Sequence, residues 1–187
     1  AWTGDAVSGV TLQGGETLPA QGVVLAVGPA VAGRLLGARA PDLSGLTPAR
    51  LCCLDLVLSA LPPGAHRLVM GIDEPLYLSV HATQPAVVAH AARYLAPGEA
   101  ADVGWLEEKL DGVWPGWRER VVHRRALSGV VATHSIPTVG TTRPPVAVGG
   151  GVCLAGDWVG EEGILADAAL TSARRAAQLL TAERAAA

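Results

Sequence analysis

The 187-residue chain contains no phenylalanine, one methionine and three cysteines, and only 17% of its residues are charged. Half of its residues are hydrophobic, so the chain is too apolar to be disordered and long enough to bury a substantial core. Three cysteines are too few for a disulfide framework, and the adjacent Cys52 and Cys53 cannot form a CxxC redox or zinc element. We therefore expect a reduced, cytoplasmic chain.

The charge balance and the lengths of the apolar runs exclude two further classes. The formal net charge is -3, and no basic stripe with interleaved aromatic residues is present, which argues against nucleic acid as a partner. No apolar run reaches the roughly 18 residues that span a bilayer, and the opening residues lack the pattern of a signal peptide. The sequence thus predicts neither nucleic-acid binding nor a membrane span.

The first quarter of the chain predicts a hairpin, a buried strand and a helix. Residues 6–19 contain two short strand patterns around a Gly-Gly turn, and residues 23–27 are apolar throughout. An unbroken apolar run of this length is typical of a strand covered on both faces in a parallel sheet. Gly28 ends that strand, and Pro29 suits the first position of the helix that follows.

The middle of the chain predicts an antiparallel sheet. Four strand patterns follow one another between residues 51 and 95, separated by PPG, DEP and TQP breakers, and short connections favour antiparallel pairing. Residues 99–114 predict an amphipathic helix, and residues 118–135 another strand region. Residues 139–150 are rich in Pro and Gly, which predicts an irregular loop.

The tail predicts a second buried strand of the parallel type at 152–155, a glycine-bearing loop, and a long helix beginning between Gly163 and Leu165. Small residues at helical spacing are expected to pack that helix closely against a sheet or partner helix; they are Ala166, Ala169, Ala173 and Ala177. The fold class is α/β (α+β) with two lobes, one made of residues 1–38 and 146–187 and the other of residues 39–145.

The segment LAGDWVGEEGILADAALTSARRAA resembles the C-terminal FAD-binding motif of the flavin-dependent amine oxidase and phytoene desaturase superfamily. Residues 7–37 resemble the hairpin and returning strand with which that superfamily re-enters its FAD domain. The resemblance implies that the first lobe is part of a Rossmann-like FAD/NAD(P)-binding lobe. It implies that the second is an antiparallel-sheet substrate lobe with helices.

The resemblance also implies a set of cofactor-binding positions. Asp157 matches the acid that hydrogen-bonds the ribityl and phosphate region of FAD, while Leu165 and Ala166 match a helix start whose N–H groups face the flavin ring. Trp158 lines the flavin or substrate cavity, or is a buried anchor, and both roles stay open. The full predicted set is Gly156, Asp157, Trp158, Gly163, Leu165 and Ala166, and Asp167 departs from the glycine usual in the family.

Tyr77 and His81 are the predicted substrate-binding residues, because a period of two places both on one face of a strand. The alternative is an ordinary strand position with a satisfied polar tip. His81 and His90 together with Cys52 or Cys53 match no known metal spacing, so no metal is predicted. No catalytic residue can be assigned from the sequence.

The dinucleotide fingerprint GxGxxG, which would hold the FAD diphosphate, is absent, and the chain begins with Ala1. We therefore expect the C-terminal half of a longer FAD-dependent oxidoreductase, which oxidises an apolar or amine-bearing small molecule by hydride transfer to flavin. The half alone is expected to be inactive and to self-associate through uncovered apolar surface. The alternative is a stand-alone, non-catalytic binding or interaction module derived from a flavoprotein.

Overall fold

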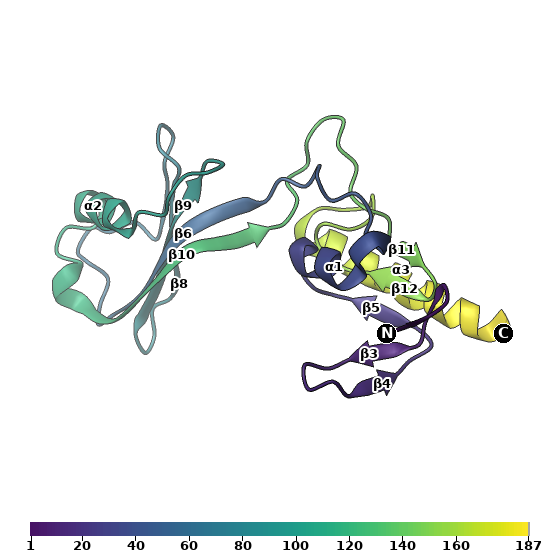
Figure 1. Ribbon diagram of the computed structural model, residues 1–187. Helices are drawn as coiled ribbons and strands as arrows, with labels where there is room; N and C mark the ends of the chain where they lie inside the picture. Colours follow the sequence, from purple (N-terminus) through teal and green to yellow (C-terminus); the bar gives the residue numbers. More distant parts are fainter. Residues whose placement is uncertain (187) are drawn as a thin grey trace. The chain divides into compact units, whose positions relative to one another are not determined.

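The computed structural model describes residues 1–186, with the side chains of residues 1–182. The chain forms two compact units: unit 1 comprises Ala1–Pro48 and Thr133–Ala187, and unit 2 comprises Ala49–Ala132 (Figure 1). The sequence placed these boundaries at residues 38/39 and 145/146. They lie elsewhere because Leu43 and Leu46 pack against the core of unit 1, and because Ile136 N–H donates to the Thr47 carbonyl.

The central sheet of unit 1 has the strand order β11-β12-β5, formed by β11 (Ala147–Gly149), β12 (Val152–Leu154) and β5 (Val23–Leu25). β12 pairs with β5 in parallel, and β11 pairs with β12 antiparallel. The predicted parallel relation of the two apolar strands is confirmed. Helix α1 (Pro29–Leu36) contributes Ala32 and Leu36 to a core that also contains Leu154 and Trp158.

Two expectations for these strands are wrong. The strand at 23–27 was expected to be covered on both faces, but the side chain of Val24 is 40% exposed. Among the described residues β5 is an edge strand, so fewer side chains cover it. Part of the predicted irregular loop is strand β11, which pairs with β12 despite the surrounding prolines and glycines.

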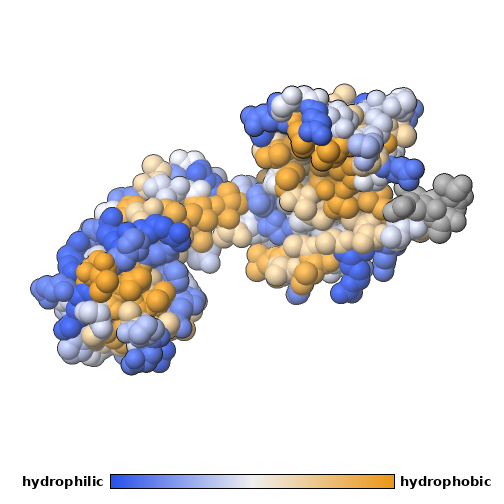
Figure 2. Space-filling view, turned by 90° about the horizontal axis from the view of Figure 1, so that it is seen from below, coloured by the Kyte–Doolittle hydropathy of each residue, from blue (hydrophilic) through white to orange (hydrophobic). Residues whose placement is uncertain are grey.

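Figure 2 shows hydrophobic side chains on the visible surface of both units.

Short elements complete the first segment of unit 1. The predicted hairpin is confirmed as β3 (Gly9–Thr11) paired antiparallel with β4 (Thr17–Pro19). It follows a smaller pair, β1 (Trp2–Thr3) with β2 (Ala6–Val7). A 3-10 turn, η1 (Gly37–Arg39), continues directly from α1.

Helix α3 (Leu165–Ala186) begins where the sequence predicts, but it buries a different stripe of small residues. The buried positions are Ala168, Ser172 and Ala176, not the stripe that begins at Ala166. The Ser172 hydroxyl sets this rotation, because its Oγ accepts the Gly156 N–H at 3.0 Å and thereby turns this side of the helix toward the end of β12. None of the described helices has the length and hydrophobicity needed to cross a bilayer.

Unit 2 is a five-stranded sheet with a helix packed against it. Neighbouring strands are ordered β10-β6-β9-β8-β7, with antiparallel β6–β9, β9–β8 and β8–β7 pairs. The strands are β6 (Ala49–Leu58), β7 (Leu68–Met70), β8 (Leu76–Ala82), β9 (Val87–Leu95) and β10 (Val121–Thr133). The mixture of helices with mainly antiparallel sheets confirms the α+β class.

Helix α2 (Val103–Val113) covers one face of this sheet, and the 3-10 turn η2 (Arg118–Arg120) leads from it into β10. The Asp102 carboxylate caps the helix by accepting the Trp105 N–H at 3.1 Å. Leu106 and Leu110 are buried among the inward residues of β6, which include Leu54 and Leu56. Alternate β6 residues therefore face the core, as a strand period of two requires.

The packing of α2 predicts the effect of truncating its buried face. Leu110→Ala removes a fully buried side chain and should lower the free energy of unfolding by about 2–5 kcal/mol. The matched control is Leu68→Ala, where the side chain is mostly exposed and the change should stay within about 0.5 kcal/mol. Urea unfolding followed by tryptophan fluorescence measures both, and equal midpoints for the two variants would contradict this packing.

Candidate functional site

The candidate site lies in unit 1, at the carboxyl ends of the two parallel strands. Gly28 follows β5 and Asp157 follows β12, and parallel pairing brings both to one edge of the sheet. Ligands of open α/β sheets bind at such edges, since the strands end there and helices begin. The predicted positions Asp157, Leu165 and Ala166 belong to this region.

The Asp157 carboxylate is held by three donors from the last residue of β10 and the residue that follows it. Its Oδ2 accepts the Thr133 hydroxyl at 2.6 Å and the His134 backbone N–H at 2.7 Å, while Oδ1 lies 3.0 Å from His134 Nδ1. Burial alone would raise the pKa of Asp157, but the hydrogen bonds from Thr133 and His134 outweigh it and the pKa lies below its ordinary value. Asp157 is therefore ionised at neutral pH, and both its oxygens already accept from the chain.

The imidazole of His134 spans the space between Asp157 and Gly28. One ring nitrogen contacts the carboxylate, and the other faces the backbone at the end of β5. A side chain built at Gly28 would lie 2.9 Å from His134 Nε2. Glycine at this position is thus required for the ring to lie where it does.

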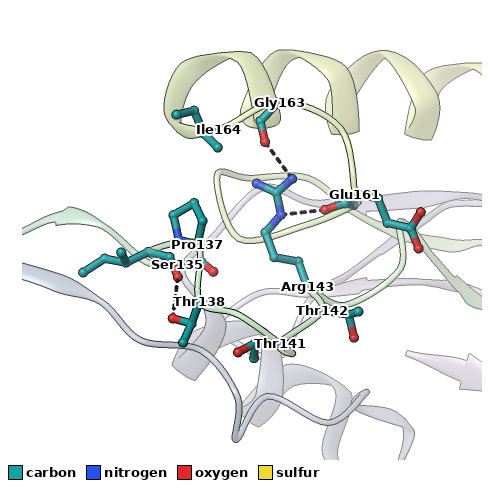
Figure 3. A pocket seen from close by; sticks show the side chains of 11 residues that line it. Ser135, Pro137, Thr138, Thr141, Thr142, Arg143, Glu161, Gly163 and Ile164 are labelled. Carbon is teal, nitrogen blue, oxygen red and sulfur yellow. Dashed lines mark hydrogen bonds between the residues drawn. The ribbon is translucent and has the colours of Figure 1, made fainter.

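Arg143 ties the loop after Asp157 to the start of α3. Its guanidinium donates to four backbone carbonyls: Nε to Gly160 at 2.6 Å, Nη1 to Asp157 at 3.3 Å, and Nη2 to Glu162 at 3.1 Å and Gly163 at 2.8 Å. Figure 3 draws the bonds to Gly160 and Gly163. These carbonyls belong to a loop that forms no regular secondary structure, so the side chain supplies hydrogen bonds that a helix or sheet would otherwise give. Arg143 thereby sets the direction in which α3 begins.

The start of α3 has an unusual backbone. Gly163 has φ +68°, and a side chain there would lie 2.9 Å from Asp167 Cβ. Leu165, the first helical residue, has φ +52°, which is rare for a residue other than glycine. Asp167 and Ala168 donate their N–H groups to the Ile164 carbonyl. The N–H groups of Leu165 and Ala166 come earlier in the first turn, where the helix itself provides no acceptor for them. These two groups are the ones the sequence predicted to face a ligand.

A cavity of about 500 Å³ adjoins this helix start (Figure 3). Its walls come from residues 135–143 on one side and residues 160–164 on the other, with Arg143 between them. Ile136, Pro137 and Ile164 make parts of the wall apolar, while three threonines and Arg143 supply polar groups. Its volume falls within the range of small-molecule sites, and its apolar walls with a few polar groups are typical of them.

Gly156 and Trp158 have packing roles in this structure. The indole N–H of Trp158 donates to the Val27 carbonyl at 3.1 Å, and the side chain is only 1% exposed. A side chain at Gly156 would lie 2.7 Å from that indole nitrogen, so the glycine makes room for the ring. Of the two roles left open for Trp158, the geometry corresponds to the buried anchor.

Tyr77 and His81 lie in unit 2, on β8. His81 Nε2 is 2.8 Å from the Ser79 hydroxyl, and its ring meets the His90 ring edge-on with 4.5 Å between centroids. His90 Nδ1 is in turn 2.6 Å from Asp55 Oδ1, whose other oxygen accepts from Arg125. This arrangement forms a polar row across four strands. Within the described residues no group of three or more His, Cys, Asp or Glu side chains could hold a metal ion.

Comparisons with known proteins assign no family. The chain matches no family model and no curated protein. Among solved structures it is similar to OxyS anhydrotetracycline hydroxylase from Streptomyces rimosus, with 17% identity and a TM-score of 0.43 over 85% of this chain and 30% of that chain. The chain thus corresponds to less than a third of that protein, and a likeness at this score does not establish a shared fold. The superfamily that the tail resembles stays a prediction.

The contacts of Arg143 predict what its removal does. Arg143→Met leaves carbonyls of the 157–163 loop without their donor and should destabilise unit 1 by about 1–3 kcal/mol. The loop amides should also exchange hydrogen faster, which mass spectrometry of deuterated peptides measures. The matched control, Arg174→Met, changes an exposed arginine of α3 and should leave both quantities nearly unchanged. Equal exchange in the two variants would contradict the role given to Arg143.

The lowered pKa of Asp157 predicts a pH dependence of stability. A carboxyl whose pKa is lower in the folded state stabilises the fold above its ordinary value near 3.8, and this contribution is lost as the pH falls from there through the folded pKa. Asp157→Asn lacks the titrating group, so its free energy of unfolding should fall less steeply than that of the unmodified chain below about pH 4. Urea titrations at a series of pH values compare the two slopes, and parallel slopes would refute the assignment.

Proposed function

We propose that this chain supplies the C-terminal part of the FAD-binding lobe, together with the substrate lobe, of an oxidoreductase of the amine oxidase and phytoene dehydrogenase type. The observation that carries the proposal is the carboxyl edge of the β5–β12 pair, where Arg143 lines the cavity and donates to backbone carbonyls of both Asp157 and Gly163, next to the start of α3. Bound flavin would supply two-electron chemistry by accepting a hydride from an apolar or amine-bearing small molecule.

The residues present fit one end of FAD. The cavity has apolar walls for a ring system, and the first N–H groups of α3 are suited to the negative charge that a reduced flavin carries near N1. Asp167, in the first turn, is exposed to solvent, which limits its repulsion of such a charge. The Asp157 carboxylate, whose side chain is 19% exposed, is the acceptor for ribityl hydroxyl groups that the resemblance implies.

The sequence provides no binding motif for the diphosphate end of FAD. The sequence contains no GxGxxG motif, and among the described residues β5 is the edge of a parallel pair with Val24 exposed. An apolar edge strand of this kind is open to pairing with a further strand. We propose that a further polypeptide segment completes the sheet and carries the phosphate loop, and that this chain by itself is inactive.

The proposed partner is therefore a small-molecule substrate, bound with help from Tyr77 and His81, in a cytoplasmic setting. Nucleic acid and membrane have no part in the proposal. The second candidate, a non-catalytic binding module, shares the same edge and helix start but requires no flavin. Flavin binding by the purified chain therefore decides between the two.

The test is a fluorescence titration of the chain with riboflavin, FMN and FAD. We expect riboflavin fluorescence to be quenched on binding, and we expect FAD to bind no more than about threefold more tightly, because no group on the chain is placed for the diphosphate. Gly163→Ala should weaken binding of all three at least tenfold, since a β-carbon there meets Asp167 and forces α3 to start elsewhere.

The control is Gly14→Ala, where a β-carbon meets no atom within 4 Å and binding should be retained. Absence of binding for all three flavins would remove the flavin proposal and favour the non-catalytic module. Tightly held FAD that an added amine or alkene bleaches would contradict the incompleteness of the site.

A further inference from the structure

Arg143 places a positive charge in the wall of the cavity, and this charge has no carboxylate partner. The hydrogen bonds of its guanidinium go to four backbone carbonyls between residues 157 and 163. Within the described part of the chain, no acidic side chain forms an ion pair with it. Carbonyl groups satisfy the N–H donors of an arginine, but they are dipoles without net charge and do not cancel a charge of +1.

The acidic side chains around this wall offset the charge of Arg143 only weakly. Glu161 also lines the cavity, but its side chain is exposed and its carboxylate points away from the guanidinium (Figure 3). The side chain of Glu162 is exposed, and the Asp157 carboxylate does not line the cavity and accepts its hydrogen bonds from residues 133–134. Water and salt screen exposed charges more than the partly buried Arg143. The cavity therefore favours a negatively charged ligand.

The hydrogen bonds of Arg143 also restrict the kind of anion. A guanidinium has five N–H groups, and the four hydrogen bonds to carbonyls leave one of them. A phosphate or carboxylate is typically bound by two parallel N–H groups of an arginine, which Arg143 cannot offer. Arg143 can therefore act on a ligand chiefly through its charge, which suits a ring with delocalised negative charge better than an oxyanion.

A flavin is a ring of this kind, and its charge depends on its oxidation state. The ring system is neutral when oxidised, whereas the reduced ring carries negative charge near N1. The apolar walls of the cavity, which include Ile136 and Ile164, accept both forms alike. A positive charge beside the ring distinguishes them, and the first N–H groups of α3 act in the same direction.

We propose, as an extension of the flavin proposal above, that Arg143 makes the cavity bind reduced flavin more tightly than oxidised flavin and so raises the reduction potential of the bound flavin. Arg143 then has two roles. Its hydrogen bonds position the start of α3, and its charge sets how readily the bound ring accepts electrons. No motif in the sequence pointed to Arg143 for either role.

The experiment measures the affinity of the whole chain for riboflavin in its two oxidation states. Riboflavin has no phosphate, so the reduced ring carries its only charge. Anaerobic titrations at about pH 8 should show reduced riboflavin binding about tenfold more tightly than the oxidised form. The two-electron potential of bound riboflavin should then lie about 30 mV above that of free riboflavin, which a redox titration against a reference dye checks. This comparison needs no substitution.

The variants separate the charge of Arg143 from its hydrogen bonds. Arg143→Gln removes the charge and keeps an amide donor, so the ratio of the two affinities should fall to about twofold or less. Arg143→Lys keeps the charge with fewer hydrogen bonds and should retain most of the ratio. A displaced α3 alone would weaken both oxidation states alike, so the ratio reports the charge.

The matched control is Arg174→Gln, which removes the same charge from an exposed position of α3 that does not line the cavity. Its ratio should equal that of the unmodified chain. Thermal unfolding of all three variants reports any cost to stability separately from the ratio.

Three results would overturn the proposal while leaving flavin binding intact. They are equal affinity of the unmodified chain for the two oxidation states, an unchanged ratio in Arg143→Gln, and a ratio lost in Arg143→Lys as fully as in Arg143→Gln. If the unmodified chain binds riboflavin in neither state, the function proposed above fails, and the role of Arg143 toward flavin fails with it.

Discussion

The parallel pairing of β5 with β12 is the interaction on which the candidate site depends. This pairing aligns Val23 with Val152 and Leu25 with Leu154. The two strands are separated in sequence by all of unit 2. Because the strands run in the same direction, Gly28 and Asp157 emerge at one edge, and Trp158 can reach the Val27 carbonyl. The contact of His134 with both strand ends follows from the same alignment.

The features that the sequence predicted correctly are those with a strong local pattern. An unbroken apolar run marked each parallel strand, the Gly-Gly turn marked the β3–β4 hairpin, and helical spacing marked α2. Asp157 and the start of α3 could be located from the residues around them. Each of these signals lies within about twenty residues of chain, a span over which backbone preference and burial period act together.

Other features depend on contacts between distant segments, and no local pattern carries them. Arg143 lies in a Pro-rich stretch without periodicity, yet it bonds to carbonyls up to twenty residues away. The buried stripe of α3 was misassigned because both series of small residues have helical spacing, and the contact of Ser172 with Gly156 distinguishes the buried one. His134 could not be found either, since its partner Asp157 lies beyond the loop that contains Arg143.

The division of unit 1 into two segments has a consequence for the order of folding during synthesis. Unit 2 is continuous, so its sheet can form as soon as β10 has left the ribosome. β5 is made early, but its parallel partner β12 emerges only after unit 2 is complete, a delay on the order of ten seconds at typical elongation rates. During that interval Val23, Val24 and Leu25 of β5 lack their native pairing partners in β12. Before residue 152 appears, the nascent chain therefore carries an apolar strand whose backbone groups lack their native partner.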